Sequence, residues 1–322
     1  MKKLLALASC ALLFLSGCGS DTSESTRVVF AMDTVMKVTV YDHEDALNYA
    51  EEYIKRCDRL FDKSNENGSL YRLNHAEGKT VSVYPEIAEQ LSYARTVYNL
   101  TGGALNIALA PLVDLWGFDG SGYRVPLEED IAELLPLTDF TRIIQSNNEI
   151  TMPAGMSITL GATAKGYTAE GLRSILAEQG VEHAIIELGG NVRTLGLRPD
   201  GKRWRVAVMG ADGSYCAAVE LGDEAAVTSG SYQRFFERGG RVYHHILDPK
   251  TGFPAQSGLS SVTVICGDSA YADALSTALF VLGEDGARRL YETSGGFEAI
   301  FLREDGTVSY TQGLDGRIEL LS

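Results

Sequence analysis

The sequence has few cysteines, and they are scattered. Of five cysteines in 322 residues, Cys10 and Cys18 lie in or at the end of an apolar leader, which leaves Cys57, Cys216 and Cys266. An odd set of widely spaced cysteines builds neither a disulfide framework nor a zinc site. Two alternatives stay open for these three residues, one disulfide bridge or three buried free thiols.

Long hydrophobic runs and repeats are also lacking beyond the leader. No second apolar run is long enough to cross a bilayer, no motif recurs with a period of about 20 to 50 residues, and no Pro-rich or Ser-rich linker divides the chain. These absences exclude polytopic membrane proteins and repeat architectures. The roughly 300 residues after the leader are enough for one large domain with a buried core.

Basic charge is scarce. The chain has 28 Lys and Arg against 43 Asp and Glu, which gives a formal net charge of -15. This balance argues against a nucleic-acid partner, because the phosphate backbone favours basic surfaces. A phosphate-bearing ligand would need local compensation from a divalent cation, from backbone N–H groups at helix starts or from a few basic residues.

The first residues have the pattern of a lipoprotein signal peptide. Lys2 and Lys3 precede an apolar run, Leu4–Leu15, which is shorter than the roughly 20 residues of a transmembrane helix. The run ends in Leu15-Ser16-Gly17-Cys18, so we expect residues 1–17 to be removed and Cys18 to carry lipid. A plain secretory signal or an uncleaved anchor is the alternative. Residues 18–27 would be a flexible tether, and residues 28–322 a single domain anchored to the cell membrane on its extracytoplasmic face.

The pattern of apolar residues predicts a chain that mixes strands and helices. Val28–Val40 contains β-like segments around Met32-Asp33-Thr34, and Leu259–Cys266 is a further expected strand. Helices are expected at Glu44–Phe61, Ile87–Leu100 and Ala270–Leu282. Strict βαβ repetition is missing, so we predict an α+β (mixed α/β) fold and not a Rossmann fold.

The expected helix Ala270–Leu282 carries a possible cation site. Asp273 and Thr277 are four residues apart, so their side chains would project from one helix face about a turn apart. Both offer hard oxygen ligands, which magnesium prefers together with waters and substrate phosphates. The alternative is structural, with Asp273 capping the first turn and Thr277 bonding back to a helix carbonyl.

A second candidate is the small-residue segment Thr159–Tyr167, which is expected to leave a strand, turn and enter a helix that ends near Gln179. Amides at such a helix start can face phosphate, a carbonyl in the turn can bind a cation, and Lys165 can neutralise charge. Neither the phosphate-loop nor the Rossmann glycine pattern is present, so a plain tight turn is the alternative. Glu187–Asn191 and Val227–Tyr232 repeat the pattern of a strand that opens into Gly or hydroxyl residues.

The apolar segment Ala104–Phe118 is interrupted by Pro111 and closes with Trp116 and Phe118. Its composition suits the wall of a flat ligand pocket, and core packing is the alternative.

Taken in order, these motifs resemble the ApbE family of FAD:protein FMN transferases over nearly the whole chain after the leader. The segments that carry the resemblance are Met32-Asp33-Thr34, Gly103-Ala104 through Phe118, Leu160-Gly161-Ala162 with Lys165-Gly166-Tyr167, Leu188-Gly189-Gly190-Asn191, Thr228-Ser229-Gly230, His245 with Asp248-Pro249-Lys250-Thr251-Gly252, and Ala272 to Thr277. The resemblance implies mixed sheets flanked by helices and an exported or lipid-anchored enzyme that binds FAD and magnesium. Such enzymes cleave FAD, join FMN through a phosphoester to a Thr or Ser of a target protein, and release AMP.

The resemblance also implies particular site residues. It implies that Asp273, Thr277 and the Ala162 backbone carbonyl hold magnesium. It implies FAD contacts at Met32, Ser64, Ala104, Leu105, Asn106, Thr159, Lys165 and Leu247. The chain departs from the usual family residue at Ser64, where Tyr is common, and at Asn106, Thr159 and Glu170, where Asp is common.

For catalysis, we expect Lys165 to neutralise charge beside the Asp273 site and a histidine to act as base. His245 is the expected base because its unperturbed pKa of about 6.5 is close to working pH, and His244 is its rival, since only one of the two can face the pocket. Asp248 is expected to orient its turn or the metal waters.

The resemblance implies two partners, FAD and an exported target protein with a Ser/Thr-Gly-Ala-Thr/Ser motif, which we expect to be a membrane redox subunit. An FAD pyrophosphatase that gives FMN and AMP, or a non-catalytic FAD-binding lipoprotein, is the alternative function.

Overall fold

The computed structural model describes residues 22–321. The expected signal peptide, Cys18 and the first part of the tether lie outside the described residues, so the lipid anchor stays a prediction. Among residues 22–321, no helix is long and apolar enough to cross a membrane.

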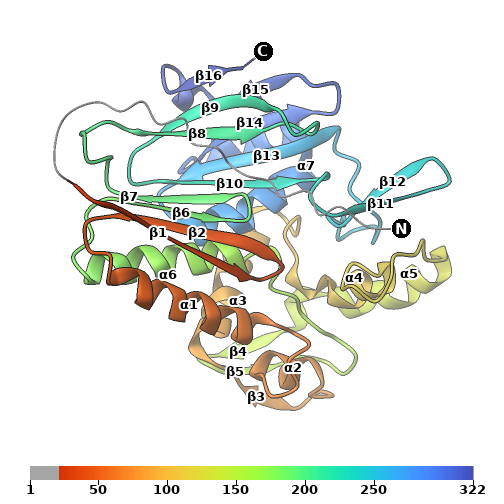
Figure 1. Ribbon diagram of the computed structural model, residues 1–322. Coiled ribbons are helices and arrows are strands. Elements are labelled where there is room, and N and C mark those ends of the chain that lie inside the picture. The colour runs from red at the N-terminus through yellow and green to blue at the C-terminus, as the bar shows by residue number, and fades with distance from the viewer. Residues whose placement is uncertain (1–21, 322) are drawn as a thin grey trace, which may run out of the picture.

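The centre of the molecule is a sheet of eight strands (Figure 1). In spatial order these are β1 (Glu24–Ala31), β2 (Thr34–Tyr41), β6 (Ala184–Leu188), β7 (Asn191–Leu195), β10 (Ala225–Gly230), β13 (Leu259–Cys266), β14 (Glu298–Arg303) and β15 (Val308–Tyr310). The α+β class is confirmed. Within it the sheet is antiparallel and not mixed, because hairpins join β1 to β2 and β6 to β7, whereas parallel neighbours would need crossovers.

Helices cover one face of this sheet. They are α1 (Ala46–Phe61), α6 (Ala164–Glu178) and α7 (Ser269–Ser294), and α3 (Pro85–Leu100) packs against α7. A small sheet of β16 (Ile318–Leu320), β9 (Tyr215–Leu221) and β8 (Trp204–Met209) packs on the opposite face through a separate apolar cluster. The large sheet is therefore buried on both sides, which explains why every residue of β13 is buried.

The remaining elements form two groups beside the main layers (Figure 1). One is a three-stranded sheet of β3 (Thr80–Ser82), β5 (Glu149–Thr151) and β4 (Ile144–Ser146) beside α2 (Ser69–Asn74). The other comprises the short helices η1 (Ile107–Leu109), α4 (Ala110–Trp116), α5 (Glu128–Leu134), η2 (Leu135–Thr138) and η3 (Phe140–Arg142), and the hairpin β11 (Phe235–Arg238) and β12 (Arg241–His244). A last short helix, η4 (Gln312–Leu314), precedes β16.

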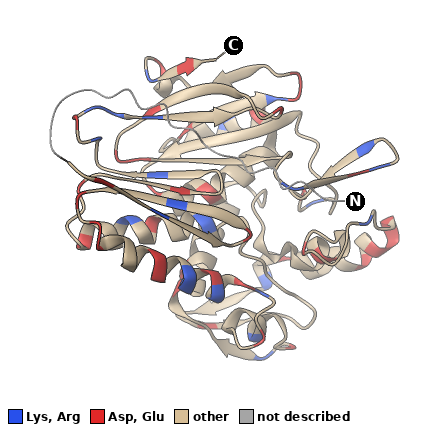
Figure 2. Cartoon of the chain, viewed as in Figure 1, with Lys and Arg blue, Asp and Glu red and all other residues tan. Residues whose placement is uncertain are grey.

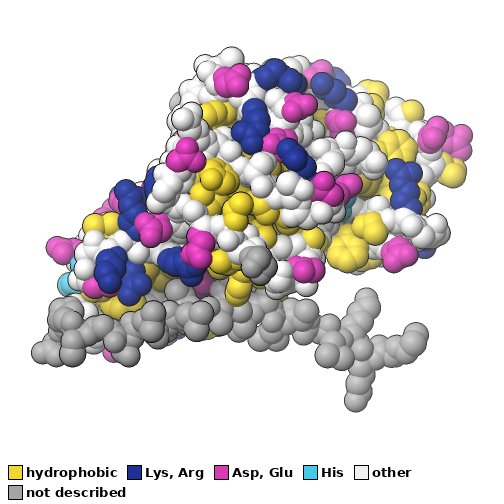
Figure 3. Space-filling model, turned by 90° about the horizontal axis from the view of Figure 1, so that it is seen from above, with side chains coloured by type: hydrophobic (Ala, Val, Ile, Leu, Met, Phe, Trp, Pro, Cys, Tyr) yellow, Lys and Arg dark blue, Asp and Glu magenta, His cyan; other side chains and the backbone are white. Residues whose placement is uncertain are grey.

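Charge is distributed unevenly over these elements. Acidic side chains gather on α5, whose first turn holds three of them (Figure 2). On the face seen from above, basic and acidic side chains are interspersed (Figure 3). Neither sign of charge dominates that face.

Most of the expected elements form, with shifted ends. The expected strand Leu259–Cys266 is β13, and α1 and α3 begin within two residues of their predicted starts. The expected helix Ala270–Leu282 is longer and continues to Ser294, with a kink at Gly283, whose φ is 69°. The helix resumes beyond the kink because the glycine accepts a conformation that other residues rarely adopt.

One local expectation is wrong. Thr159 and Leu160 do not leave a strand, since β5 ends at Thr151 and residues 152–160 have no strand pairing. Pro111, which interrupts the apolar segment, stands in the first turn of α4, where its missing N–H is not needed.

The three cysteines of the described chain are free thiols. Of the two alternatives left open by the sequence, the free thiols are therefore the correct one. Burial raises the pKa of Cys57 and of Cys266 to about 11, so both thiols stay protonated at neutral pH.

Candidate active site

The candidate site lies at one end of the large sheet, where two turns meet. The turn from β1 to β2 places Met32 and Asp33 at φ values of 48° and 59°, a conformation that Met rarely adopts. The Met32 amide donates to Asp58 Oδ1 of α1 at 2.7 Å, which holds this turn. A Cβ on Gly189, in the turn from β6 to β7, would lie 2.6 Å from Thr34 Oγ1, so the two turns touch. Unusual backbone held in place in this way is typical of functional sites.

Asp273 of α7 faces the first turn of α6. Its Oδ2 accepts a hydrogen bond of 2.7 Å from the Gly166 amide, one of the first-turn amides of α6 that have no acceptor within the helix, four residues after Ala162. The helices can approach because position 166 is glycine, whose added Cβ would lie 2.1 Å from Ser269 O and 2.5 Å from Asp273 Cβ. The predicted metal residues Asp273 and Ala162 are thus brought to the same helix start.

Thr277, one turn after Asp273, faces β10. Its Oγ1 lies 3.1 Å from Ser229 Oγ, which also lies 2.8 Å from Ser276 Oγ. Ser276 donates in turn to the Asp273 carbonyl at 2.9 Å. The predicted pair therefore lies on one face of α7, beside a row of buried hydroxyls.

The chemistry of this donor set fits magnesium. Asp273 is only 3% exposed, and none of the ion pairs within residues 22–321 includes it, so its charge has no basic partner. The same residues contain no cluster of three His, Cys, Asp or Glu side chains that would hold a metal alone. One carboxylate with a hydroxyl and a carbonyl is a set that a hard cation completes with waters and phosphate oxygens.

His245 directly follows β12 and has one ring nitrogen free. Its Nδ1 donates to the Arg234 carbonyl at 3.0 Å, so the unprotonated nitrogen of the neutral ring is Nε2. Burial lowers the pKa of His245 to about 4; the Arg234 carbonyl opposes this shift, and the charges of Arg234, His244 and Lys165 add to it. His245 therefore stays neutral at working pH, and its pKa lies well below the ordinary value of about 6.5 on which the expectation of a base rested.

His244 has a different environment. Its Nε2 donates to the Ala255 carbonyl at 3.1 Å, and its ring stands edge-on to Phe280 of α7 with the centroids 5.4 Å apart. Burial lowers its pKa as well. Since His244 packs into the core while His245 lies near Lys165, His245 is the better placed of the two candidates. Its role as base stays a prediction.

A pocket of about 200 Å³ is lined by one of the predicted FAD contacts, Asn106. Its lining includes Gly103, Asn106, Pro249 and Lys250, so it joins the Ala104–Asn106 segment to the turn after Asp248. The Thr159 amide donates to the Ile107 carbonyl at 2.8 Å, which brings Thr159 to the same segment. Ala104 and Leu105 are buried beside it.

The Asn106 side chain has a structural task in this pocket. Its Oδ1 accepts from the Ala108 amide at 2.8 Å, which caps η1, and its Nδ2 donates to the Thr138 carbonyl at 2.8 Å. An Asp at this position could make only the first of these bonds. Asn106, which replaces the usual family Asp, therefore connects the pocket wall to Thr138 of η2 through this second hydrogen bond.

Ser64 and Leu247 are among the predicted FAD contacts that do not line this pocket. Ser64 is exposed in the loop after α1, where its hydroxyl donates to Asp62 at 2.6 Å. Leu247 is 4% exposed and belongs to the apolar cluster of Trp116, which also contains Leu135 of the pocket lining.

The aromatic residues of the Ala104–Phe118 segment are core residues. Trp116 is fully buried and Phe118 nearly so, so neither forms an exposed pocket wall. The Trp116 indole N–H donates to the Gly252 carbonyl at 2.9 Å. In the same turn, Asp248 accepts a hydrogen bond of 2.9 Å from the Lys250 amide. Asp248 therefore orients its turn, which is one of the two roles expected for it.

A buried ion network beside Asp273 was missed by sequence reasoning. Arg193 of β7 is 1% exposed and donates to Glu170 Oε2 at 3.0 Å and to Asp223 Oδ1 at 2.8 Å. Glu170 Oε2 also accepts from the Ser269 amide at 3.0 Å. The network joins α6, α7 and β7, and so fixes the contact of Gly166 with Asp273. An arginine at the centre of the short strand Asn191–Leu195 was the one signal that could have revealed it.

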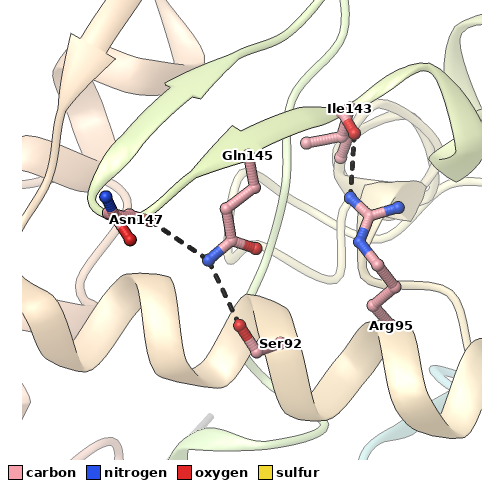
Figure 4. Close-up of a pocket in the computed structure, with 5 residues that line it drawn as sticks. All are labelled: Ser92, Arg95, Ile143, Gln145 and Asn147. Carbon is pink, nitrogen blue, oxygen red and sulfur yellow. Dashed lines mark hydrogen bonds between the residues drawn. The ribbon is translucent and has the colours of Figure 1, made fainter.

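A larger hollow of about 560 Å³ lies away from these residues (Figure 4). It is lined by Ser92 and Arg95 of α3 and by Ile143, Gln145 and Asn147 around β4. Its polar groups bond to one another: Gln145 Nε2 donates to Ser92 Oγ at 3.2 Å, and Arg95 donates to the Ile143 carbonyl at 2.8 Å. No predicted site residue lines it.

Comparisons with known proteins identify the family of this chain. The model of the ApbE family matches residues 32–301. An FAD:protein FMN transferase of Klebsiella pneumoniae is 34% identical over 89% of this chain and 91% of its own length. One from Treponema pallidum is 31% identical over 97% of this chain and 94% of its own length.

Solved structures show the same fold. The crystal structure of the ApbE protein from Thermotoga maritima matches with a TM-score of 0.86 and 30% identity, covering 92% of this chain and 99% of that one. The apo form of the Pseudomonas stutzeri flavinyl transferase ApbE matches with a TM-score of 0.83 and 28% identity, covering 92% of this chain and 97% of that one.

The relatives named as FAD:protein FMN transferases are enzymes that transfer a group, and this chain is an enzyme of that transferase class. It belongs to the ApbE family.

Proposed function

We propose that this protein is a magnesium-dependent FAD:protein FMN transferase. It would cleave FAD, attach FMN by a phosphoester bond to a Thr or Ser of an exported target protein, and release AMP. Within the family relationship, the observation that carries this proposal is the environment of Asp273 in α7. Its carboxylate is buried without a basic partner, faces the start of α6 and lies one turn from Thr277.

Asp273, Thr277 and the Ala162 carbonyl are the groups that would hold magnesium. Bound there, the ion would supply neutralisation of the diphosphate oxygens and of the departing AMP. Asp273 stays in place because Gly166 fixes one of its oxygens, and Lys165 adds a positive charge near the reacting groups.

His245 has the proton-accepting role in this proposal. Its Nε2 would take the proton of the acceptor hydroxyl as that oxygen bonds to the FMN-side phosphorus. The bond from this phosphorus to the bridging oxygen breaks, and AMP leaves with that oxygen. The hydrogen bond from Nδ1 to Arg234 orients the ring for this transfer.

The acceptor belongs to the proposal as well. We expect an exported membrane redox subunit with a Ser/Thr-Gly-Ala-Thr/Ser motif, and the lipid on Cys18 would hold the enzyme at the same membrane surface. Comparing flavinylated proteins from cells with and without this enzyme tests this part, and an unchanged set would contradict it.

The transferase is tested directly by incubating the full-length protein with FAD, magnesium and a domain that bears the acceptor motif. We expect fluorescent, covalently labelled acceptor and an equal amount of AMP. Asp273→Ala should reduce labelling about hundredfold or more, because it removes the only side-chain charge of the metal site. Asp212→Ala is the matched control, since Asp212 is exposed in the turn between β8 and β9.

The products distinguish the alternatives. AMP and free FMN without labelled acceptor would identify an FAD pyrophosphatase. Tight binding of FAD without AMP would identify a non-catalytic FAD-binding protein.

A further inference from the structure

Asn191 is a buried polar side chain whose hydrogen bonds are unmade. It is the first residue of β7, directly after the Gly189-Gly190 turn, and is 1% exposed. Neither its Oδ1 nor its Nδ2 has a hydrogen-bond partner within residues 22–321. Burying a primary amide without partners is costly, and nearly all such groups in folded proteins are satisfied by protein, water or ligand.

The strand register shows which face of the sheet Asn191 occupies. Side chains two residues apart in a strand share a face, and Arg193 points to Glu170 of α6. Asn191 also pairs with Val227 of β10, two residues before Ser229, whose hydroxyl contacts Thr277 of α7. Both neighbours place Asn191 on the face that α6 and α7 cover.

The level of Asn191 along the helices follows from the directions of α6 and β7. A short loop, residues 179–183, joins α6 to β6, so β6 runs back against α6. Since β7 is antiparallel to β6, α6 and β7 run in the same direction. Asn191 precedes Arg193 by two residues, which is about 6.6 Å along β7. Gly166 precedes Glu170 by four residues, which is about 6 Å along α6. Asn191 therefore lies at the level of Gly166, the residue that holds Asp273.

We propose that Asn191 is a binding residue for the magnesium diphosphate of the substrate. Its Nδ2 donates to a phosphate oxygen, and its Oδ1 accepts from a water of the hydrated cation. This inference rests on the proposed function and adds to it a residue beyond the metal set Asp273, Thr277 and Ala162. A neutral amide suits the position, because a second carboxylate beside Asp273 would repel a diphosphate.

The apo protein provides a readout that does not depend on catalysis. Asn191→Leu has nearly the same shape without polar atoms, so it removes the unpaired amide. The proposal expects an apo melting temperature equal to or above that of the wild type. It also expects the affinity for magnesium-ADP, and for FAD with magnesium, to fall about tenfold or more, measured by calorimetry on the full-length protein.

Two further variants keep the test decisive. Asn191→Ala leaves room for water and should weaken binding in the same way, which provides a result if Asn191→Leu does not fold. Thr194→Val is the matched control on the other face of β7: its hydroxyl donates to the Gly222 carbonyl at 2.5 Å, so this change should lower the melting temperature without changing affinity.

Unchanged affinity in the Asn191 variants would overturn this inference. The hydrogen-bond partner of the Asn191 amide would then be a structural water and not the ligand. A wild-type protein that binds neither FAD nor magnesium-ADP would overturn the proposed function itself.

Discussion

At the scale of single residues, His245 shows how position sets chemistry. The ring is tied through Nδ1, and burial with nearby positive charge lowers its pKa to about 4. A lowered histidine pKa means that the neutral form persists to lower pH. A base with this pKa is fully available throughout the neutral range.

The pH dependence of transfer follows from this pKa. We expect kcat/KM of the wild type to stay level as pH falls from 8 to about 5 and to decline only as it approaches 4. The NMR titration of the His245 ring should have its midpoint near the same value. A decline centred near pH 6.5, the ordinary histidine value, would contradict the buried environment.

His245→Gln should lower the rate about hundredfold, which is the usual size of a general-base contribution.

At the scale of elements, the position of Asp273 depends on how α6, α7 and β7 are joined. Arg193 makes this junction through four acceptors: Glu170, Asp223 and the carbonyls of Thr194 and Gly267. The guanidinium can reach them together because its donors form a planar fork. The side chain is almost fully buried, so lost partners cannot be replaced by water.

Arg193→Lys tests this junction. The ammonium keeps the charge but cannot bond to all four acceptors, so we expect a loss of about 2 kcal/mol in the free energy of unfolding, measured with urea. Affinity for magnesium should fall with it, because α6 and α7 lose their common anchor. Arg205→Lys is the control: Arg205 pairs with Glu319 on the surface, and the expected change is below about 1 kcal/mol. Equal effects of the two changes would disprove the anchoring role.

The sequence predicted elements well where the pattern is local and long. The buried strand β13 and the helices α1 and α3 show clear apolar periodicity. The three-residue strands β3, β4 and β5 are too short to show a period, and the hairpin β11–β12 is largely exposed. The expected helix end at Leu282 coincides with the kink at Gly283, and the sequence did not predict the helical turns that follow it to Ser294.

At the scale of the whole molecule, the site joins segments that are far apart in the chain. Asp273 and Thr277 could be paired from helix spacing alone, Lys165 was indicated by the small-residue segment Thr159–Tyr167, and the resemblance added Ala162. The Gly166 contact, the Arg193 network and the unpaired Asn191 amide arise only when α6, α7 and β7 come together, so no local pattern contains them.

Magnesium binding should therefore be visible in global stability. The ion would bind the folded site and not the unfolded chain, in which Asp273, Thr277 and Ala162 are separated, so it shifts the folding equilibrium by mass action. At about 100 times the dissociation constant the gain is roughly 2.7 kcal/mol, which corresponds to a rise of several degrees in the melting temperature for a domain of this size.

The measurement compares thermal unfolding in EDTA and in magnesium for the wild type, Asp273→Asn and Asp212→Asn. We expect the magnesium-dependent rise in the wild type and in Asp212→Asn, and none in Asp273→Asn, whose neutral amide is a poor ligand for a hard cation. Because Asp273 is buried without a basic partner, the wild type and Asp212→Asn should both lose more stability than Asp273→Asn when EDTA replaces magnesium. An equal rise in all three proteins would place the cation elsewhere and separate the metal from α7.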